Sequence, residues 1–213
     1  MAILFDMDGT LFDTNTVLAP ALDATFSELR AAGLWQGETP FDTYTKIMGV
    51  PLPVVWQTLC PAHTAAQHIA SNTLFQQHLH EMINTQGALY PGVRDTLATL
   101  AEHHALYIVS NGNAPYLDKI VTHFELTPYI TAIYSIDRVA SGDKGELMRL
   151  LLTEQGITEA SVVGDRRSDI EGALANGLTA YAAGYGYGSQ EEWAGAQAVL
   201  SDFPSLKKHV MLL

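Results

Sequence analysis

Five short apolar runs recur along the chain, and a segment with helical periodicity follows each of the first four. The runs cover residues 2–5, 105–109, 131–135, 160–163 and 178–182. Short strands that are apolar on both sides and alternate with helices are typical of a parallel sheet covered on both faces. We therefore predict an α/β chain with a doubly wound parallel sheet.

The helical segments between these runs have their own boundary signals. Apolar residues recur at helical spacing in the segments 93–103, 115–124, 145–155 and 169–176. Pro115 opens one of them, at a position where the missing N–H costs little. Gly156 and Gly177 follow two others and are suited to a left-handed helix end. These signals support the alternation of strands and helices.

Between the first and second runs lies a long segment of a different kind. Residues 14–88 contain no clear strand and several helical stretches, and a simple crossover needs only about a dozen residues. An elaborate crossover packed on the core is one interpretation. We favour an inserted α-helical cap, because ligands in such folds bind outside the carboxyl ends of strands. We expect a core of 1–13 plus 89–213.

The charge balance is strongly acidic, with 11 Lys+Arg, 23 Asp+Glu and a formal net charge of -12. Nucleic acids and anionic membranes bind basic surfaces, so we expect neither as a partner. We also expect no signal peptide and no membrane-spanning helix, which needs roughly 18 or more apolar residues. The single cysteine, Cys60, fits a reducing compartment. We expect a cytoplasmic protein, and the sequence leaves its oligomeric state open.

Polar residues follow three of the predicted strands. They are Asp6 and Asp8 after the first strand, Ser110 and Asn111 at the second, and Asp165 and Asp169 after the fourth. The carboxyl ends of parallel strands share one edge of a sheet, so we expect these groups to converge. Asp6 and Asp8 point the same way if the segment is extended, and Gly9 then permits a tight turn that places the Thr10 hydroxyl.

Clustered carboxylates repel each other, and a hard cation relieves the repulsion. Asp6, Asp8 and Asp165 offer a few oxygen ligands, which suits Mg²⁺ better than Ca²⁺ or Zn²⁺. One carboxylate is then free to attack phosphorus as a covalent nucleophile. The charge of a transferring phosphoryl group needs nearby donors, and Lys144, Ser110 and backbone N–H groups are suitable.

These motifs resemble those of the haloacid dehalogenase-like hydrolases, a superfamily dominated by phosphatases. DMDGTLFD matches the family signature DxDGTLxD, and IVSNG is similar to the second motif. Lys144 takes the place of the third, and GDRRSD fits the fourth, GDxxxD. LYPGV at 89–93 is similar to the point where such chains return from an α-helical cap. The resemblance covers essentially the whole chain and implies a Rossmann-like core with an inserted cap.

The resemblance also implies a role for each motif residue. Asp6 attacks phosphorus and forms an aspartyl-phosphate, and Asp8 protonates the leaving oxygen and then activates water. Asp6, the backbone carbonyl of Asp8, and Asp165 bind Mg²⁺, with Asp169 acting through water. The residues that bind the phosphate or line its site are Thr10, Ser110, Asn111 and Lys144.

The leading expectation is a phosphatase of the phosphoglycolate phosphatase group, acting on a small phosphorylated metabolite. A phosphomutase of the β-phosphoglucomutase type shares the cap and motifs and is the alternative. A non-catalytic binding module on the same fold would have lost Asp6, Asp8 or the acidic fourth motif, and this chain retains them. The natural substrate is not specified. Candidate specificity residues lie in 41–53, among them Lys46 and the Gly49-Val50-Pro51 turn. Lys46 is either a substrate contact or an ordinary exposed lysine, and the second interpretation is slightly favoured.

Two positions depart from the pattern of the family. Gly145 follows Lys144 where many relatives have proline, and Arg166-Arg167 stand where relatives often have a small residue. Asp143, beside the lysine, is interpreted as a turn residue. We interpret the two arginines as partners of acidic neighbours rather than anion-binding groups, because surface ion pairs are commonly structural.

Two further patterns are interpreted as structural. Cys60-Pro-Ala-His63 offers half of a metal site, but the sequence has no second pair to complete it. The glycine-rich segment 184–188 (GYGYG) follows the fifth strand without the spacing of a nucleotide-binding loop. We expect it to form a loop beside the active site.

Overall fold

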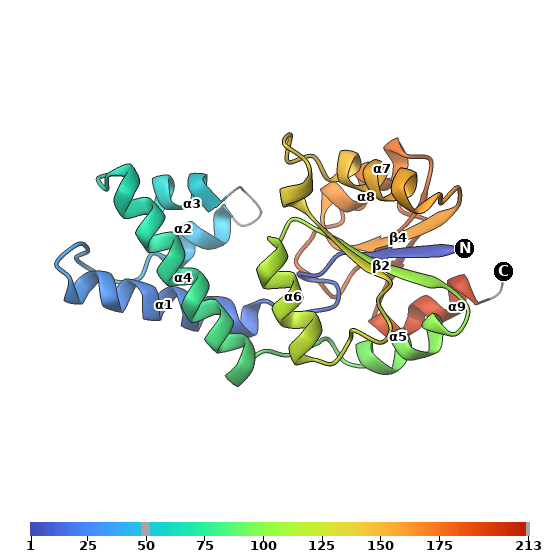
Figure 1. Ribbon diagram of the computed structural model, residues 1–213, viewed down its shortest axis with the longest axis horizontal. Helices are drawn as coiled ribbons and strands as arrows, with labels where there is room; N and C mark the ends of the chain where they lie inside the picture. The colour runs from blue at the N-terminus through green and yellow to red at the C-terminus, as the bar shows by residue number, and fades with distance from the viewer. Residues whose placement is uncertain (48–51, 212–213) are drawn as a thin grey trace. The chain divides into compact units, whose positions relative to one another are not determined.

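The computed structural model describes residues 1–47 and 52–211 and contains a parallel β-sheet (Figure 1). Its strands are β1 (Ala2–Phe5), β2 (Ala105–Ser110), β3 (Ala132–Ser135), β4 (Ala160–Gly164), β5 (Thr179–Ala183) and β6 (Ala198–Leu200). They are ordered β3-β2-β1-β4-β5-β6, and every neighbouring pair is parallel. The predicted α/β fold with a doubly wound parallel sheet is confirmed.

Helices cover both faces of this sheet. They are α5 (Val93–Ala101), α6 (Ala114–His123), α7 (Lys144–Gln155), α8 (Arg167–Ala175) and α9 (Lys207–Val210), with 3-10 turns η1 (Ile136–Arg138) and η2 (Phe203–Leu206). Helices α7 and α8 pack on one face, and α5 and α9 lie across the other (Figure 1). This arrangement explains why the strands carry apolar residues on both sides.

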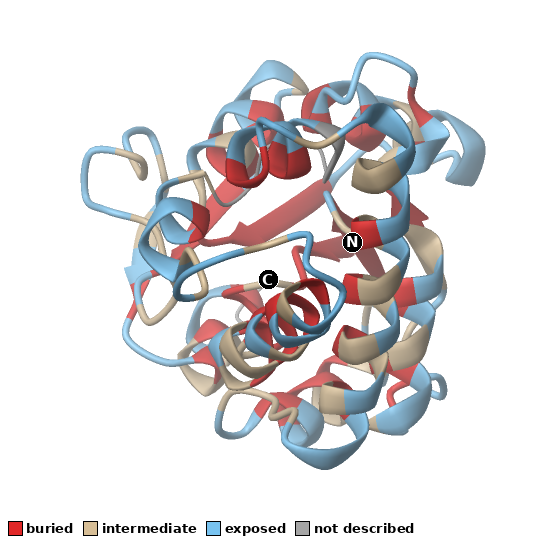
Figure 2. Cartoon of the chain, turned by 90° about the vertical axis from the view of Figure 1, so that its left-hand side faces the viewer, coloured by how far each residue is buried: buried red, intermediate tan, exposed pale blue. Residues whose placement is uncertain are grey.

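The central strands are buried along their whole length. All residues of β1 and β4 are buried (Figure 2), and Leu4 and Val162 pack with Leu147 and Ile170 of the helices in one hydrophobic core. Burial of a leucine or isoleucine side chain contributes about 1.5–3 kcal/mol. This core fixes the level at which the strands end, because a one-residue slip would turn each side chain to the other face.

One strand was not predicted. β6 contains only Ala198, Val199 and Leu200, and Val199 is exposed. A run of three residues at the sheet edge lacks the length and the continuous burial that the other five runs have. The sheet therefore has one more strand at its edge than the sequence predicted.

By its internal contacts the chain divides into two compact units. One consists of Met1–Asp13 and Ala88–Leu213, and contains the sheet; the other is Thr14–Gly87. The chain leaves and re-enters the first unit at adjacent points, since the Asp13 N–H donates to the Ala88 carbonyl at 2.9 Å and Phe12 forms an antiparallel bridge with Leu89. Among the helices that the structure describes, none is long and apolar enough to cross a membrane.

The second unit is helical in its described part. It contains α1 (Asn15–Ala31), α2 (Phe41–Lys46), α3 (Leu52–Leu59) and α4 (Ala65–Thr85). A capping box between Thr64 and Gln67 begins α4. Trp56 of α3 packs against Phe26 of α1 and Phe75 of α4, with ring centroids 6.2 and 5.9 Å away. The Gly49-Val50-Pro51 turn lies outside the described residues.

The Cys60–His63 segment has structural contacts, in agreement with its interpretation. His63 Nε2 donates to the Leu34 carbonyl at 2.7 Å, and His68 Nε2 donates to the Cys60 carbonyl at 2.8 Å. Burial raises the pKa of the Cys60 thiol to about 11, so the thiolate that would bind a metal is disfavoured at neutral pH. These groups hold the start of α4 to the segment after α1.

Candidate active site

The candidate active site lies within the first unit, where β1, β2 and β4 end. Phe5, the last residue of β1, is level with Ile108 of β2 and Val163 of β4. The next residue, Asp6, donates its N–H to the Val163 carbonyl at 2.9 Å. Because the three strands are parallel and in this register, the residues that follow them meet at one edge of the sheet.

A tight turn follows Asp6. The Met7 carbonyl accepts from the N–H groups of Leu11 and Phe12, both at 2.9 Å. Gly9 has φ +81°, and a Cβ at that position would lie 2.4 Å from Asp165 Oδ2. Glycine is therefore required twice at this position, by the left-handed backbone and by the close approach of the Asp165 carboxylate.

Three buried carboxylates form the centre of the site. Asp6, Asp165 and Asp169 each offer an oxygen, and these oxygens lie within 4.8 Å of one another. Asp165 directly follows β4, and Asp169 lies in the first turn of α8, where its Oδ2 accepts the Arg166 N–H at 3.0 Å. A side chain at Gly164 would collide with Asp169, so this glycine allows the fourth motif to fold back on itself.

Lys144 is the cation of this cluster. It is the first residue of α7 and is buried, and its Nζ lies 2.5 Å from Asp6 Oδ1 and 2.5 Å from Asp169 Oδ1. Asp143 caps the helix by accepting the Glu146 N–H at 2.7 Å, which agrees with its interpretation as a turn residue. Burial disfavours the charge of the ammonium, but Asp169 and Asp6 outweigh burial and raise the pKa of Lys144.

One ammonium does not neutralise three carboxylates. Burial, followed by the neighbouring charges of Asp6 and Asp169, raises the pKa of Asp165 to about 8. Burial also raises the pKa of Asp169 to about 6, although Lys144 opposes the shift. The pKa of Asp6 is raised by burial against the same opposition. The cluster therefore has an excess of negative charge when all three groups are ionised.

The cluster fits a hard divalent cation. Asp165 Oδ1 is buried, and within the described part of the chain it has no hydrogen-bond partner, a costly state unless a ligand binds there. The donors are carboxylate oxygens, which Mg²⁺ prefers, rather than thiols or imidazoles. Asp6, Asp165 and Asp169 are the residues that could hold such an ion.

The carboxylate of Asp8 is used differently. Its Oδ1 accepts a hydrogen bond of 2.5 Å from the Tyr116 hydroxyl of α6. The sequence placed Asp6 and Asp8 in one cluster because an extended segment points both the same way. The turn at Met7–Phe12 begins at once, and Asp8 still lies near enough for its charge to contribute, after burial, to the raised pKa of Asp6.

The candidate phosphate-binding residues have unequal positions. Ser110 is buried at the end of β2, and its Oγ accepts the Gly112 N–H at 3.2 Å. Thr10 is buried, and within the described ranges its Oγ1 has no hydrogen-bond partner. Asn111 is exposed. Ser110, Thr10 and Lys144 thus present polar groups at the strand ends, whereas Asn111 faces solvent.

The segment 184–188 contacts the site directly. The Tyr187 N–H donates to Asp165 Oδ2 at 2.7 Å, and the Tyr187 hydroxyl donates to Asp13 at 3.0 Å. The approach is close, because a Cβ at Gly188 would lie 1.8 Å from the Asp165 carbonyl. That carbonyl also accepts the Trp193 indole N–H at 2.6 Å. Sequence reasoning placed this loop beside the site but missed Tyr187, Trp193 and Tyr116. The GYGYG segment contains Tyr187, whereas Trp193 and Tyr116 lie outside it.

Arg166 and Arg167 pair with acidic neighbours, as the sequence interpretation expected. Arg166 lies 3.0 Å from Glu192, and Arg167 lies 3.6 Å from Glu171 one helical turn away. Both arginines are partly or fully exposed. Their contacts tie the start of α8 to the segment that contains Trp193, and they leave Lys144 as the cation that touches the carboxylate cluster.

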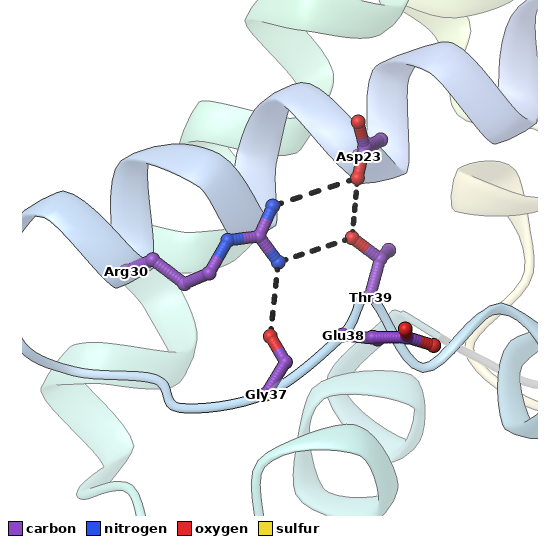
Figure 3. A pocket seen from close by; sticks show the side chains of 5 residues that line it. All are labelled: Asp23, Arg30, Gly37, Glu38 and Thr39. Carbon is purple, nitrogen blue, oxygen red and sulfur yellow. Dashed lines mark hydrogen bonds and ion pairs between the residues drawn. The ribbon is translucent and has the colours of Figure 1, made fainter.

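A polar hollow in the second unit has a structural explanation. It is lined by Asp23, Arg30, Gly37, Glu38 and Thr39 (Figure 3). The Arg30 guanidinium donates to the Gly37 carbonyl and to Thr39 Oγ1, both at 3.3 Å, and lies 3.5 Å from Asp23. Thr39 Oγ1 donates to Asp23 at 2.5 Å. These polar groups hold the loop after α1 to the helix.

Comparison with known proteins identifies the family. Residues 3–183 match the family model described as haloacid dehalogenase-like hydrolase. The chain therefore belongs to the haloacid dehalogenase-like hydrolases, and the resemblance seen in its motifs is confirmed.

Relatives of known name are similar over nearly the whole chain. The phosphoglycolate phosphatase of Photorhabdus laumondii is 29% identical, over 96% of this chain and 90% of its own length. The 5'-nucleotidase of Pseudomonas aeruginosa is 27% identical, over 89% of this chain and 85% of its own. Among solved structures, CbbY from Rhodobacter sphaeroides in complex with phosphate has a TM-score of 0.80 at 22% identity, covering 96% of this chain and 95% of that one. This likeness supports the fold.

Proposed function

We propose that this hydrolase removes phosphate from small phosphorylated metabolites in a Mg²⁺-dependent reaction, with Asp6 as the nucleophile. The observation that carries the proposal is the position of Lys144, whose ammonium lies 2.5 Å from Asp6 and Asp169 beside Asp165. Three carboxylates and a cation at this edge of the sheet suit a reaction in which an aspartate must approach an anionic phosphoryl group. The names of the curated relatives support the same reaction class.

Each residue of the site has a defined role in the proposed reaction. A carboxylate oxygen of Asp6 forms a bond to phosphorus while the bond between phosphorus and the ester oxygen breaks. Asp8 gives its proton to that oxygen, and then accepts a proton from the water that cleaves the aspartyl-phosphate. Lys144, Ser110 and Thr10 bind the phosphoryl oxygens. The alcohol and inorganic phosphate are the products.

The carboxylates need a cation for this reaction. Asp6, Asp165 and the backbone carbonyl of Asp8 would hold Mg²⁺, and Asp169 would act through water. When bound, Mg²⁺ neutralises the charge between the carboxylates and the phosphoryl group. The unsatisfied Asp165 oxygen and the raised pKa of Asp165 support a cation at this position.

We also propose that the helical unit, Thr14–Gly87, serves as a cap that selects the substrate. Its support is the point of insertion, directly after the turn that contains Asp8 and Thr10. Lys46, at the end of α2, is a candidate contact for a negatively charged substrate. Exchange of Lys46 for alanine is expected to alter the order of preference among substrates rather than the rate with p-nitrophenyl phosphate.

The experiment that tests the nucleophile uses Asp6→Asn. This variant is expected to fold, as judged by circular dichroism, and to lose hydrolysis of p-nitrophenyl phosphate in the presence of Mg²⁺. Asp95→Asn is the matched control, because Asp95 is exposed on α5, and it is expected to keep the activity of the unaltered protein. Full Mg²⁺-dependent activity of Asp6→Asn would show that Asp6 is not the nucleophile.

A panel of phosphorylated metabolites then identifies the substrate. It should contain phosphoglycolate, nucleoside 5'-monophosphates and sugar phosphates, with free phosphate measured for each. We expect release of inorganic phosphate from at least one of them at a rate well above that of the others. An isomerised sugar phosphate without free phosphate would instead indicate a phosphomutase.

A further inference from the structure

Tyr116 is a buried residue whose hydroxyl is directed at the catalytic carboxylates. It is 6% exposed and lies in the first turn of α6. Its hydroxyl donates a 2.5 Å hydrogen bond to Asp8 Oδ1. We propose that Tyr116 is a positioning residue for Asp8, which holds Oδ1 so that Oδ2 carries the proton exchanged with the leaving group and with water. This inference rests on the proposed function.

The start of α6 holds Tyr116 in place. Asn113 caps the helix by accepting the Tyr116 N–H at 3.0 Å, and the Ala114 N–H donates to Asp137 Oδ2 at 2.9 Å. The ring packs closely on the backbone that follows β2, since a Cβ at Gly112 would lie 2.9 Å from Tyr116 Cδ1. Backbone and ring are therefore both fixed, and the hydroxyl has a defined position opposite Asp8.

A carboxylate needs such a partner if the same oxygen is to give a proton in one step and to take one in the next. The terminal torsion of an aspartate is broad, so burial alone does not select one oxygen as the proton carrier. A hydroxyl that donates to an ionised carboxylate forms a short, strong bond of about 2.5–2.7 Å. The bond from Tyr116 to Asp8 has this length, and it fixes the plane of the carboxylate.

The bond also decides which oxygen is protonated. The Tyr116 hydroxyl donates this bond, so its hydrogen lies between its own oxygen and Asp8 Oδ1. A proton on Asp8 Oδ1 would face the hydrogen of the Tyr116 hydroxyl, whereas a proton on Oδ2 would not. In the first step the Oδ2–H bond breaks and the proton goes to the ester oxygen. In the second step Oδ2 takes a proton from the attacking water, and Tyr116 keeps its own proton throughout.

Tyr116→Phe tests this role, because it removes one oxygen and keeps the ring. Its kcat/KM is measured with two monoesters, p-nitrophenyl phosphate and ethyl phosphate. The ethoxide leaving group needs a proton, and p-nitrophenolate hardly does. Hydrolysis of ethyl phosphate therefore depends on the general acid, whereas hydrolysis of p-nitrophenyl phosphate hardly depends on it. We expect kcat/KM for ethyl phosphate to fall about tenfold or more and kcat/KM for p-nitrophenyl phosphate to fall much less. General acid–base catalysis contributes about 10²–10⁴-fold in total, so this loss is a part of it.

Tyr134→Phe is the matched control. Tyr134 is a buried tyrosine whose hydroxyl also donates to a carboxylate, Glu154, at 2.7 Å. Glu154 lies ten residues after Lys144 in α7, about 15 Å along the helix axis from the site. This variant is expected to leave the ratio of the two kcat/KM values unchanged, and circular dichroism shows whether each variant is folded.

A second measurement uses a double-mutant cycle with Asp8→Asn. If Tyr116 acts through Asp8, adding Tyr116→Phe to Asp8→Asn causes little further loss. An equal loss with both esters, no loss with either, or a full additional loss in the Asp8→Asn background would overturn the inference while leaving the proposed function in place. If the unaltered protein hydrolyses neither ester, the proposed function fails and the inference fails with it.

Discussion

The Lys144 ammonium lies 2.5 Å from Asp6 Oδ1 and at the same distance from Asp169 Oδ1, with all three side chains buried. Removing one partner of a buried ion pair costs about 3–5 kcal/mol. Lys144→Met is therefore expected to lower the free energy of unfolding by several kcal/mol and to abolish phosphatase activity. Chemical denaturation followed by fluorescence measures the first effect. Lys119→Met, on α6, is the control, and a Lys144→Met variant as stable as this control would contradict the role of the lysine.

The raised pKa of Asp165 predicts how the stability of the metal-free protein depends on pH. In the native protein the Asp165 carboxyl has a pKa of about 8, whereas in the unfolded chain its pKa is near 3.8. Between these values the native state binds more protons, so stability without metal falls as the pH rises. We expect a lower melting temperature at pH about 8 than at about 5.5 in the presence of a chelator.

Asp165→Asn provides the matching control for this effect. The variant removes one repelling charge, so in chelator at the higher pH it is expected to melt above the unaltered protein. Mg²⁺ binds the native state and is expected to raise the melting temperature of the unaltered protein. It should have little effect on Asp165→Asn. A similar response of both proteins to Mg²⁺ would place the metal elsewhere.

A substitution at Gly188 tests whether the glycine-rich loop 184–188 supports metal binding. A Cβ there would lie 1.8 Å from the Asp165 backbone carbonyl, so Gly188→Ala must displace either the Asp165 backbone or the loop, whose Tyr187 N–H donates to the Asp165 carboxylate. Loss of an outer-shell partner typically weakens metal affinity by about 10–100-fold, and we expect a decrease of that size for Mg²⁺ by calorimetry. Gly177→Ala is the control, because Gly177 has φ +70° and open space around it. It should reduce stability but not Mg²⁺ affinity.

Arg30 tests whether the polar hollow of Figure 3 is structural. Its guanidinium contacts Asp23 and Ser27 of α1, and it also contacts Gly37 and Thr39 of the loop after α1. Arg30→Ala is expected to lower the stability of the helical unit by roughly 1 kcal/mol for the hydrogen bonds lost. Hydrolysis of p-nitrophenyl phosphate should remain within about twofold, an energy well below one hydrogen bond. Lost activity at unchanged stability would indicate that the hollow binds substrate.

Five strands of the sheet could be predicted from the sequence because each is a continuous apolar run between helices. β4 is buried on both faces along all of its residues, and such a run leaves a clear pattern. β6 is only three residues long, with Val199 exposed, and its pattern is that of an ordinary loop. The difference lies in burial, which periodicity detects only when it extends over several residues.

The candidate site was predictable only in part. Asp6, Lys144 and Asp165 stand in short local motifs, and the positions of strand ends bring them together. The groups that orient them do not belong to such motifs. Tyr116 is 108 residues from Asp8, and Trp193 is 28 residues from Asp165. Such contacts depend on how helices and loops pack after the sheet has formed, and the local sequence does not encode them.

The hydrogen bond between Asp13 and Ala88 has a consequence for how this chain can vary. The chain leaves the first unit and re-enters it at two residues that this bond holds together, so the strands on either side are joined as if by a short turn. Insertions, deletions or a complete exchange of residues 14–87 are expected to leave the register of β1 with β2 and β4 unchanged. The two parts of one polypeptide can therefore accumulate changes at independent rates, and the geometry around Asp6 is inherited whatever replaces the intervening helices.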